Sequence, residues 1–315
     1  MALVRHLSHY FKLMYSNLFG VYSSMKIATF IHNSERKVGI VNSELNYVEC
    51  FKLTPAAANL GGLAILELLA SGEELPELGA KIALAEIRLE APIPRPRRNI
   101  FCAGKNYLEH VKEVAHSGLG SGSTSSTGAP DAPIIFSKVP ESVIADGAPI
   151  LRHANLTDQL DYEAELAVII GVGGREISQK NAMTHVWGYT IINDVSARDL
   201  QKRHQQWHLA KSLDSFCPMG PWMVSKDELD VSDTTIKCWV NSELRQNAST
   251  AQFIFDIPTL IATISAGITL YPGDIIATGT PSGVGMGFKP PRFLQSGDSV
   301  RIEIAQIGYL ENKVL

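Results

Sequence analysis

The chain has 315 residues, of which 45% are hydrophobic and 19% are charged. These values are ordinary for a globular protein with a sizeable core, and the length allows one large domain or a large and a small one. The net charge of −4 and the pI near 6.1 exclude a general basic field, so we expect no nucleic-acid partner.

The sequence also indicates where the protein is found. No segment reaches the roughly 18–20 uninterrupted apolar residues that a membrane span requires, so we expect no membrane partner. The cysteines are far apart, show no zinc-ligand spacing and read as reduced thiols, which favours a cytoplasmic location. They are Cys50, Cys102, Cys217 and Cys238.

The first 34 residues contain Arg5, Lys12 and Lys26 but no acidic residue. Residues 1–24 are interpreted as an N-terminal extension, with the domain starting at Met25. A mitochondrial location is the alternative, if this extension acts as a presequence.

The first predicted elements form a small N-terminal α/β domain over residues 25–95. Short strands are expected at residues 26–32, 37–42 and 47–51, followed by a helical stretch over 60–82 that is broken at Gly72 and Pro76. A proline-rich segment near residues 91–97 cannot be a helix interior and marks a boundary. The larger domain then spans residues 97–315.

In the larger domain strands dominate. Residues 116–133 are rich in Gly and Ser and predict a mobile surface loop. Beyond this loop we expect short strands and turns to the end of the chain, with one helical interval around residues 195–210. No regular βαβ alternation appears, so the pattern favours an α+β fold.

The segment "LDYEAELAVIIG" (residues 160–171) alternates like a strand. Its one face carries Asp161, Glu163 and Glu165, although two ionised carboxylates about 4 Å apart repel by roughly 4 kcal/mol at an effective dielectric near 20. A second apolar strand, residues 189–192, ends just before Asp194, which reaches Glu163 and Glu165 if the two strands pair. Such a set suits Mg²⁺ or Mn²⁺. The alternative is the solvated face of an edge strand.

A second group of chemical interest lies in "NIFCAGKNYLEHVKE" (residues 99–113). His110 and Glu113 are neighbours if this segment is helical, because they are three residues apart. A glutamate beside a histidine orients the ring and keeps it basic enough to take a proton from water. The alternative is an unrelated pair on an exposed helix. The flexible loop that follows indicates a lid.

Five ordered segments make the chain recognisable: "GKNYLEHVKE", "DYEAELAVIIG", "GYTIINDVSARDLQ", "HLAKSLDSFCPMGPW" and "ATGTPSGVGMG". In this order and spacing they resemble the fumarylacetoacetate hydrolase superfamily over roughly residues 97–315, with a looser match from residue 25. The resemblance implies a β-rich mixed sandwich or roll with a small N-terminal domain, and a homodimer.

The resemblance also implies roles for individual residues. Mg²⁺ or Mn²⁺ (or Ca²⁺ in a crystal) is bound at Glu163, Glu165 and Asp194, and His110 and Glu113 form a lid dyad that activates water. Arg198, Gln201 and Lys211 contact the substrate and transition state, and Thr280 binds a carboxylate. Ala103 stands where larger members carry a further aspartate ligand. The chain therefore resembles the shorter branch with three carboxylates, which includes 2-hydroxyhepta-2,4-diene-1,7-dioate isomerase and FAH domain-containing proteins, and this departure argues against fumarylacetoacetate itself as substrate.

The leading hypothesis is a Mg²⁺-dependent hydrolase that cleaves C–C bonds in small 2-oxo or 2-hydroxy-dienoic diacids, such as those of aromatic compound catabolism. Isomerisation or tautomerisation, decarboxylation of a 2-oxo diacid such as oxaloacetate, and a ureidoglycolate-lyase-type activity are the enzymatic alternatives. A non-catalytic protein that binds a small 2-oxo acid and is stabilised by its metal is the alternative from another class.

Three other motifs are set aside. The segment "HQQWH" places His204 and His208 at a helical zinc spacing, but Gln205 replaces the glutamate that acts as general base. The glycine-rich "GTPSGVGMG" lacks the Lys-Ser/Thr of a phosphate-binding loop. Cys217 has no base beside it in the sequence and is interpreted as a core thiol.

Overall fold

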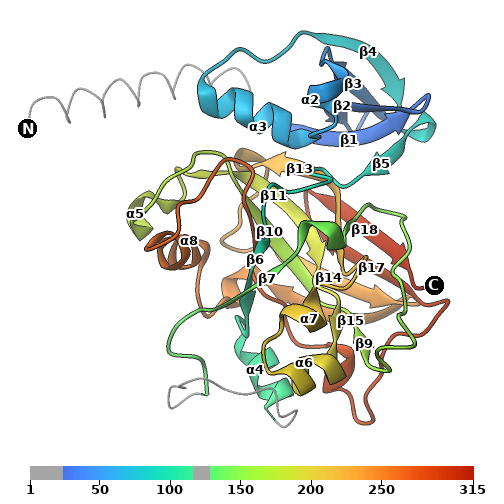
Figure 1. Cartoon of the computed structure of the whole chain (residues 1–315), viewed down its shortest axis with the longest axis vertical. Coiled ribbons are helices and arrows are strands. Elements are labelled where there is room, and N and C mark those ends of the chain that lie inside the picture. The colour runs from blue at the N-terminus through green and yellow to red at the C-terminus, as the bar shows by residue number, and fades with distance from the viewer. Residues whose placement is uncertain (1–23, 116–127) are drawn as a thin grey trace, which may run out of the picture.

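The computed structural model describes residues 24–115 and 128–315. The prediction of an N-terminal extension, and most of the predicted loop at 116–133, concern residues outside these ranges. Figure 1 shows the strands and helices of residues 26–90 at one end of a larger, strand-rich body.

The N-terminal elements confirm the three predicted strands and correct the prediction that follows them. They are β1 (Lys26–His32), β2 (Glu35–Asn42), β3 (Tyr47–Phe51), α2 (Pro55–Ala58), α3 (Gly62–Ser71), β4 (Leu78–Ala83) and β5 (Arg88–Glu90). Helix α3 is capped at its C-terminus by Gly72, which adopts the left-handed conformation that favours glycine at this position. The helical prediction for residues 78–82 was wrong. These residues form β4, because Pro76 ends helical continuity and the free edge of β3 offers hydrogen bonds.

The main sheet is mixed and runs in the order β4-β3-β2-β1-β13-β11-β10-β16-β6-β7, with β5 added at β1 and β8 at β13. Its remaining strands are β6 (Ile100–Gly104), β7 (Ile134–Lys138), β8 (Val143–Ile144), β10 (Ala164–Ile170), β11 (Val186–Asn193), β13 (Cys217–Ser225) and β16 (Ile275–Ala277). Strand β10 is central, with β11 on one side and β16 on the other, and all its residues are buried. The alternative of a solvated edge strand is therefore excluded.

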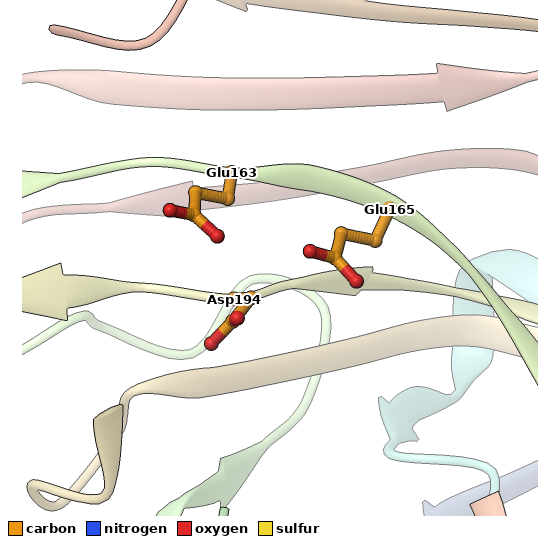
Figure 2. A group of neighbouring side chains, drawn as sticks. All are labelled: Glu163, Glu165 and Asp194. Atoms are coloured by element: carbon orange, nitrogen blue, oxygen red, sulfur yellow. The ribbon is translucent and has the colours of Figure 1, made fainter. Parts of the chain in front are cut away.

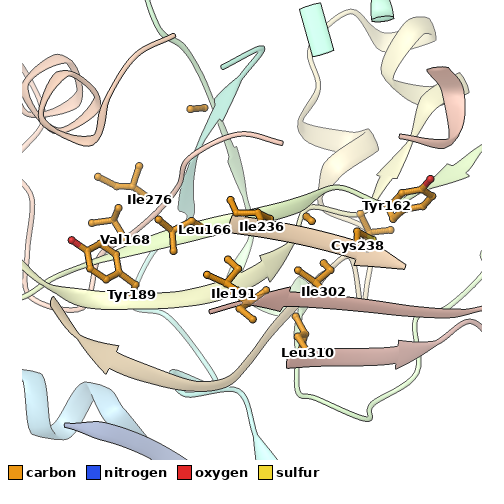
Figure 3. Packing of buried hydrophobic residues seen from close by; sticks show 14 of the residues in the cluster. Tyr162, Leu166, Val168, Tyr189, Ile191, Ile236, Cys238, Ile276, Ile302 and Leu310 are labelled. Atoms are coloured by element: carbon orange, nitrogen blue, oxygen red, sulfur yellow. The ribbon is translucent and has the colours of Figure 1, made fainter. Parts of the chain in front are cut away.

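A second sheet packs against the main one. It has the order β15-β14-β17-β18 and consists of β14 (Thr235–Val240), β15 (Glu243–Ser249), β17 (Ser299–Ile304) and β18 (Gly308–Lys313). Figure 3 shows side chains of both sheets meeting in one core, with Leu166 and Ile191 from the main sheet near Ile236 and Ile302 from the second. A small two-stranded sheet joins β9 (Leu160–Asp161) to β12 (Ser196–Ala197). The expected α+β, β-rich sandwich is confirmed.

The remaining helices are short and lie outside the sheets. They are α4 (Leu108–Val114), α5 (Gln179–Ala182), α6 (Arg198–His204), α7 (His208–Lys211) and α8 (Ile257–Ser265), with 3₁₀ turns η1 (Leu84–Glu86), η2 (Pro140–Ser142), η3 (Lys226–Glu228), η4 (Thr250–Gln252) and η5 (Gly285–Gly287). The prediction of a single helical interval after residue 133 was wrong, since α5 and α8 were missed. Asp256 caps α8 through the backbone N–H of Thr259, and Pro258 lies in the first turn of the helix. An aspartate cap followed by a proline in the first turn is a helix-start signal that the sequence itself contains.

The two predicted domains share a sheet and a core. Strand β1 pairs with β13 of the larger part, and Met25 donates its N–H to the hydroxyl of Ser225. One buried cluster contains Ile27 and Leu63 together with Trp187. The boundary near residues 91–97 stays a prediction.

Candidate active site

The central hairpin of the main sheet brings three carboxylates together. Strands β10 and β11 pair with Ala164 opposite Asn193, and the N–H of Asp194 donates to the carbonyl of Glu163 at 2.9 Å. Carboxylate oxygens of Glu163, Glu165 and Asp194 lie within 4.8 Å of one another, and all three residues are buried. Figure 2 shows the three side chains pointing toward one another, Glu165 from β10, Glu163 from just before β10 and Asp194 from just after β11.

Asp161 does not belong to this cluster, which corrects its predicted place on the same strand face. The chain leaves strand geometry between β9 and β10, so the alternation of residues 161–165 is interrupted. The carboxylate of Asp161 accepts hydrogen bonds from Arg198 Nε at 2.9 Å and from the backbone N–H groups of Gly285 and Met286 at 2.6 and 3.0 Å. Asp161 therefore holds the guanidinium of Arg198 and the loop at Gly285 in place beside the site.

Three buried basic side chains surround the cluster. Lys211 Nζ lies 2.8 Å from Glu163 and 2.7 Å from Asp194, and Arg198 Nη1 lies 2.6 Å from Glu163. Lys138, at the end of β7, donates to Asp194 at 2.7 Å. The sequence analysis missed Lys138. A lysine at the end of the apolar run "IIFSK" was the available signal, because a lysine is rarely fully buried without a partner.

These charges move the pKa values of the acids in opposite directions. Burial alone would raise the pKa of Glu163, but the charges of Lys211 and Arg198 outweigh it and hold that pKa well below its usual range. Burial, with the negative charges of Asp194 and Glu163, raises the pKa of Glu165 well above its ordinary value. Among the described residues no basic side chain forms an ion pair with Glu165. Negative charge is therefore least compensated at Glu165.

The predicted histidine–glutamate pair forms on α4. His110 Nδ1 lies 3.1 Å from Glu113 Oε2, and His110 is buried. The other carboxylate oxygen of Glu113 accepts the backbone N–H of Gly283 at 2.8 Å. With a carboxylate at Nδ1, that nitrogen carries the proton and Nε2 is left as the basic atom. The alternative of an unrelated exposed pair is excluded by this burial.

The glycine-rich segment binds carboxylates of the protein with its backbone. Gly279 donates its N–H to Glu165 at 2.8 Å, Gly283 donates to Glu113, and Gly285 donates to Asp161. Gly279 has φ of +97°, which a side chain would strain, and a Cβ on Gly287 would lie 2.1 Å from Glu113 Oε1. The sequence analysis rejected phosphate binding here but did not find this role.

The remaining predicted residues line the same pocket, whose volume is about 20 Å³. Gln201 accepts a hydrogen bond from Arg198 at 3.1 Å, and the hydroxyl of Thr280 donates to the carbonyl of Ala164 at 3.0 Å. Ala103 also lines the pocket. The lining residues are Ala103, Gly104, Lys105, His110, Val114, Phe136, Glu163, Glu165, Arg198, Gln201, Trp207, Lys211 and Thr280.

Two of the motifs that were set aside can be placed in the structure. Helix α6 ends at His204, and Gln205 takes a positive φ of 59°, so the two histidines of "HQQWH" do not share one helix. Cys217 is buried in the core, where burial raises the pKa of its thiol to about 12. All the cysteines are free thiols.

Comparison with known proteins agrees with this fold. Residues 99–315 match the family model described as fumarylacetoacetate (FAA) hydrolase C-terminal, and the chain belongs to this family. The resemblance drawn from the five sequence segments is confirmed, and relatives in this family are enzymes that include hydrolases, isomerases and a tautomerase.

Two relatives are particularly informative. An oxaloacetate tautomerase, YisK of Bacillus subtilis, is 50% identical over 240 residues, which are 76% of this chain and 77% of that protein. The structure of a fumarylacetoacetate hydrolase from Exiguobacterium antarcticum covers 92% of this chain and 99% of its own, with 41% identity and a TM-score of 0.77.

A third similar structure is a 2-hydroxyhepta-2,4-diene-1,7-dioate isomerase from Mycobacterium marinum, which is 31% identical with a TM-score of 0.73 and covers 92% of this chain and 98% of its own. Within residues 24–115 and 128–315, no helix has the length and apolar character needed to cross a membrane.

Proposed function

We propose that this protein catalyses the enol–keto tautomerisation of a small 2-oxo diacid of the oxaloacetate type. The observation that carries the proposal is the shared pocket: His110, Glu163, Glu165 and Lys211 line one small cavity. Glu113 is hydrogen-bonded to His110 behind it, and Asp194 belongs to the same carboxylate cluster. The identity with an oxaloacetate tautomerase over three quarters of both chains supports the same reaction.

The residues present fit a divalent cation. All three candidate ligands are carboxylates, the oxygen donors that Mg²⁺ and Mn²⁺ prefer. Glu165 lies among like charges with no basic partner in the described part of the chain, so a cation there would relieve a real electrostatic cost. Glu163, Glu165 and Asp194 would hold it. When bound, the cation supplies stabilisation of the negative charge that develops on the 2-oxo oxygen.

The side chains of the protein perform the other parts of the reaction. Lys211 and Arg198 present positive charge to the carboxylate of the substrate. His110 Nε2 takes a proton from C3 of the keto form, the electron pair of that C–H bond forms the C2–C3 double bond, and the π electrons of the C2=O bond move to oxygen. That oxygen takes a proton from water, and His110 releases its proton to water, which regenerates the base. Glu113 holds the ring in the tautomer that makes Nε2 the base. No atom is gained or lost overall.

C–C bond hydrolysis, as in acylpyruvates or fumarylacetoacetate-like diacids, is the second candidate. The same pair favours it, because a buried histidine held by a glutamate can take a proton from water as well as from carbon. The similar structures also include a maleylpyruvate hydrolase from Sphingobium at 30% identity and a TM-score of 0.69, which covers 92% of this chain and 99% of its own.

A panel of 2-oxo diacids separates these candidates. The decay of enol-oxaloacetate and the cleavage of an acylpyruvate are followed with Mg²⁺, with Mn²⁺ and with EDTA. We expect cation-dependent decay of the enol, and a loss of about 10²–10⁴-fold in rate in His110→Ala with Mn²⁺ binding retained. The exposed His204→Ala is the matched control and keeps the wild-type rate.

The outcomes are distinct. Cleavage of the acylpyruvate without acceleration of the enol decay would replace tautomerisation by hydrolysis. If His110→Ala tautomerises the enol at the wild-type rate, His110 is not the base, and the assignment of the pair is wrong.

A further inference from the structure

A second, much larger hollow lies just outside the active-site pocket. It measures about 780 Å³, within the range of about 300–1,000 Å³ that is usual for small-molecule sites. It is bordered by α4, by α6 and by the loop that follows η5, and Figure 1 shows α4 and α6 at the end of the molecule opposite the N-terminal strands. Arg198 lines both this hollow and the active-site pocket, and Glu113, bonded to His110, lines the hollow.

The hollow is basic in an acidic protein. Five basic and two acidic side chains of the described residues line it, whereas the whole chain has a net charge of −4. Lys112 is paired with Glu109 at 2.7 Å, but Lys202, Arg203 and Lys289 form no ion pair within the described parts of the chain. They come from two separate elements, the last turn of α6 and the loop after η5.

A buried guanidinium also lacks part of its hydrogen bonding. Arg198 is 3% exposed, and its Nε and Nη1 are bonded to Asp161 and to Glu163 and Gln201. Its Nη2 is buried with no hydrogen-bond partner among the described residues. A buried donor without a partner is unfavourable, so this nitrogen has a hydrogen bond left to give to an oxygen of a ligand.

We propose that this hollow, which we call the outer basic hollow, binds a small dicarboxylate before it reaches the active site. Such a ligand has two carboxylates, and the hollow offers basic groups from two different elements, while Met286, Phe288 and Phe293 supply an apolar wall for the carbon chain. A basic cleft concentrates an anion locally even where the whole protein repels it. The ligand class rests on the proposed function, since the proposed substrate is a diacid.

The first test measures binding without turnover. Succinate is a diacid with no 2-oxo group, and its binding is measured by calorimetry in EDTA. Neutralising both sides of the hollow, with Arg203→Gln and Lys289→Gln together, should weaken binding at least about fivefold, because two charge-assisted contacts are lost. The matched control, Arg175→Gln with Lys180→Gln, removes the same charge near α5, away from the hollow, and should bind as the wild type does.

Equal weakening in both double variants would show a general charge effect and overturn the proposal. Unchanged succinate binding in the hollow variant, or no binding by the wild type, would also overturn it. Because the ligand is not a substrate and no cation is present, this test is independent of the proposed reaction.

The second test connects the hollow to turnover of enol-oxaloacetate. In the Arg203→Gln, Lys289→Gln double variant, KM should be about fivefold higher than in the wild type and kcat should be unchanged. The KM of the wild type should rise with salt concentration, whereas the KM of the variant should change much less. If the double variant has the same KM and the same salt dependence as the wild type, the hollow has no role in turnover, and its role as an outer binding step is overturned. Absence of any turnover in the wild type would refute the proposed function, while the succinate result would still decide the hollow.

Discussion

Glu165 is the residue at which the charges of the site are least balanced. Glu163 and Asp194 each contact basic side chains, while Glu165 receives the backbone N–H of Gly279. Its pKa is raised by burial and by the two neighbouring carboxylates. A cation in the cluster reverses this situation, because it favours the ionised form of every carboxylate around it.

Replacing Glu165 by Gln tests both the cost of its charge without metal and its role in binding the cation. Without metal, the folded wild type retains a proton that the unfolded chain releases above the ordinary pKa of 4.5, so its stability falls as the pH rises from that value toward the raised pKa. The uncharged Gln avoids this loss. In EDTA the variant should therefore melt at a higher temperature than the wild type, and the difference should grow as the pH rises above the ordinary pKa of 4.5.

The same variant should not bind the cation. Mn²⁺ should raise the melting temperature of the wild type but not that of Glu165→Gln, because only a ligand bound to the folded state stabilises it. The exposed Glu44→Gln is the control and should respond as the wild type does. Titration calorimetry that shows equal Mn²⁺ affinity in wild type and Glu165→Gln would refute the three-carboxylate site.

At the level of elements, the segment from Gly279 to Gly287 organises the site. Its backbone N–H groups hold the carboxylates of Glu165, Glu113 and Asp161, which come from β10, α4 and β9. Any residue type has a backbone N–H, so these hydrogen bonds do not by themselves require glycine. Glycine is required where a Cβ would collide with a neighbouring group. Gly287 illustrates this, because a Cβ there would overlap the carboxylate of Glu113.

Gly287→Ala should therefore act on catalysis and leave the fold in place. The added methyl group overlaps the Cγ, Cδ and Oε1 atoms of Glu113, so the whole side chain of Glu113 moves and His110 loses its orienting partner. We expect kcat to fall about tenfold or more, with a changed pH profile, while Mn²⁺ affinity and melting temperature remain near those of the wild type. Gly267→Ala is the control, since a Cβ at Gly267 meets nothing within 4 Å. An unchanged kcat and pH profile in Gly287→Ala would show that the position of Glu113 is unimportant.

At the level of the whole molecule, the N-terminal elements complete the core. The face of β10 that includes Ala167 and Ile169 is buried in the cluster that contains Ile27 and Leu63. Each large apolar side chain uncovered by removing these elements would lose about 1.5–3 kcal/mol of burial free energy. The edge of β13 that pairs with β1 would also lose its backbone partners.

A fragment of residues 97–315 should therefore fail to fold as the full chain does. We expect it to bind a hydrophobic dye strongly and to show no cooperative thermal transition, whereas the full chain shows one. Circular dichroism melting with dye fluorescence provides the measurement. A fragment that melts cooperatively near the temperature of the full chain would show that the predicted boundary separates independently stable domains.

Much of the site could be predicted from local pattern. Period-2 alternation ending in apolar residues identified β10, and a second apolar run ending at Asn193-Asp194 identified its neighbour, because side-chain direction in a strand follows from spacing alone. The spacing of His110 and Glu113 likewise required only that the segment be helical. The homodimer and the metal that the family resemblance implies stay predictions.

What the sequence by itself determined was the family, the α+β class and the residue types that can do chemistry. Only the tertiary structure decided which charges meet. It placed Lys138 against Asp194 across 56 residues of chain, moved Asp161 from the carboxylate cluster to Arg198, and brought the loop at Gly285 to Asp161. The physical reason is that spacing determines the direction of a side chain within one element, whereas partners of a buried charge are chosen by the packing of distant elements.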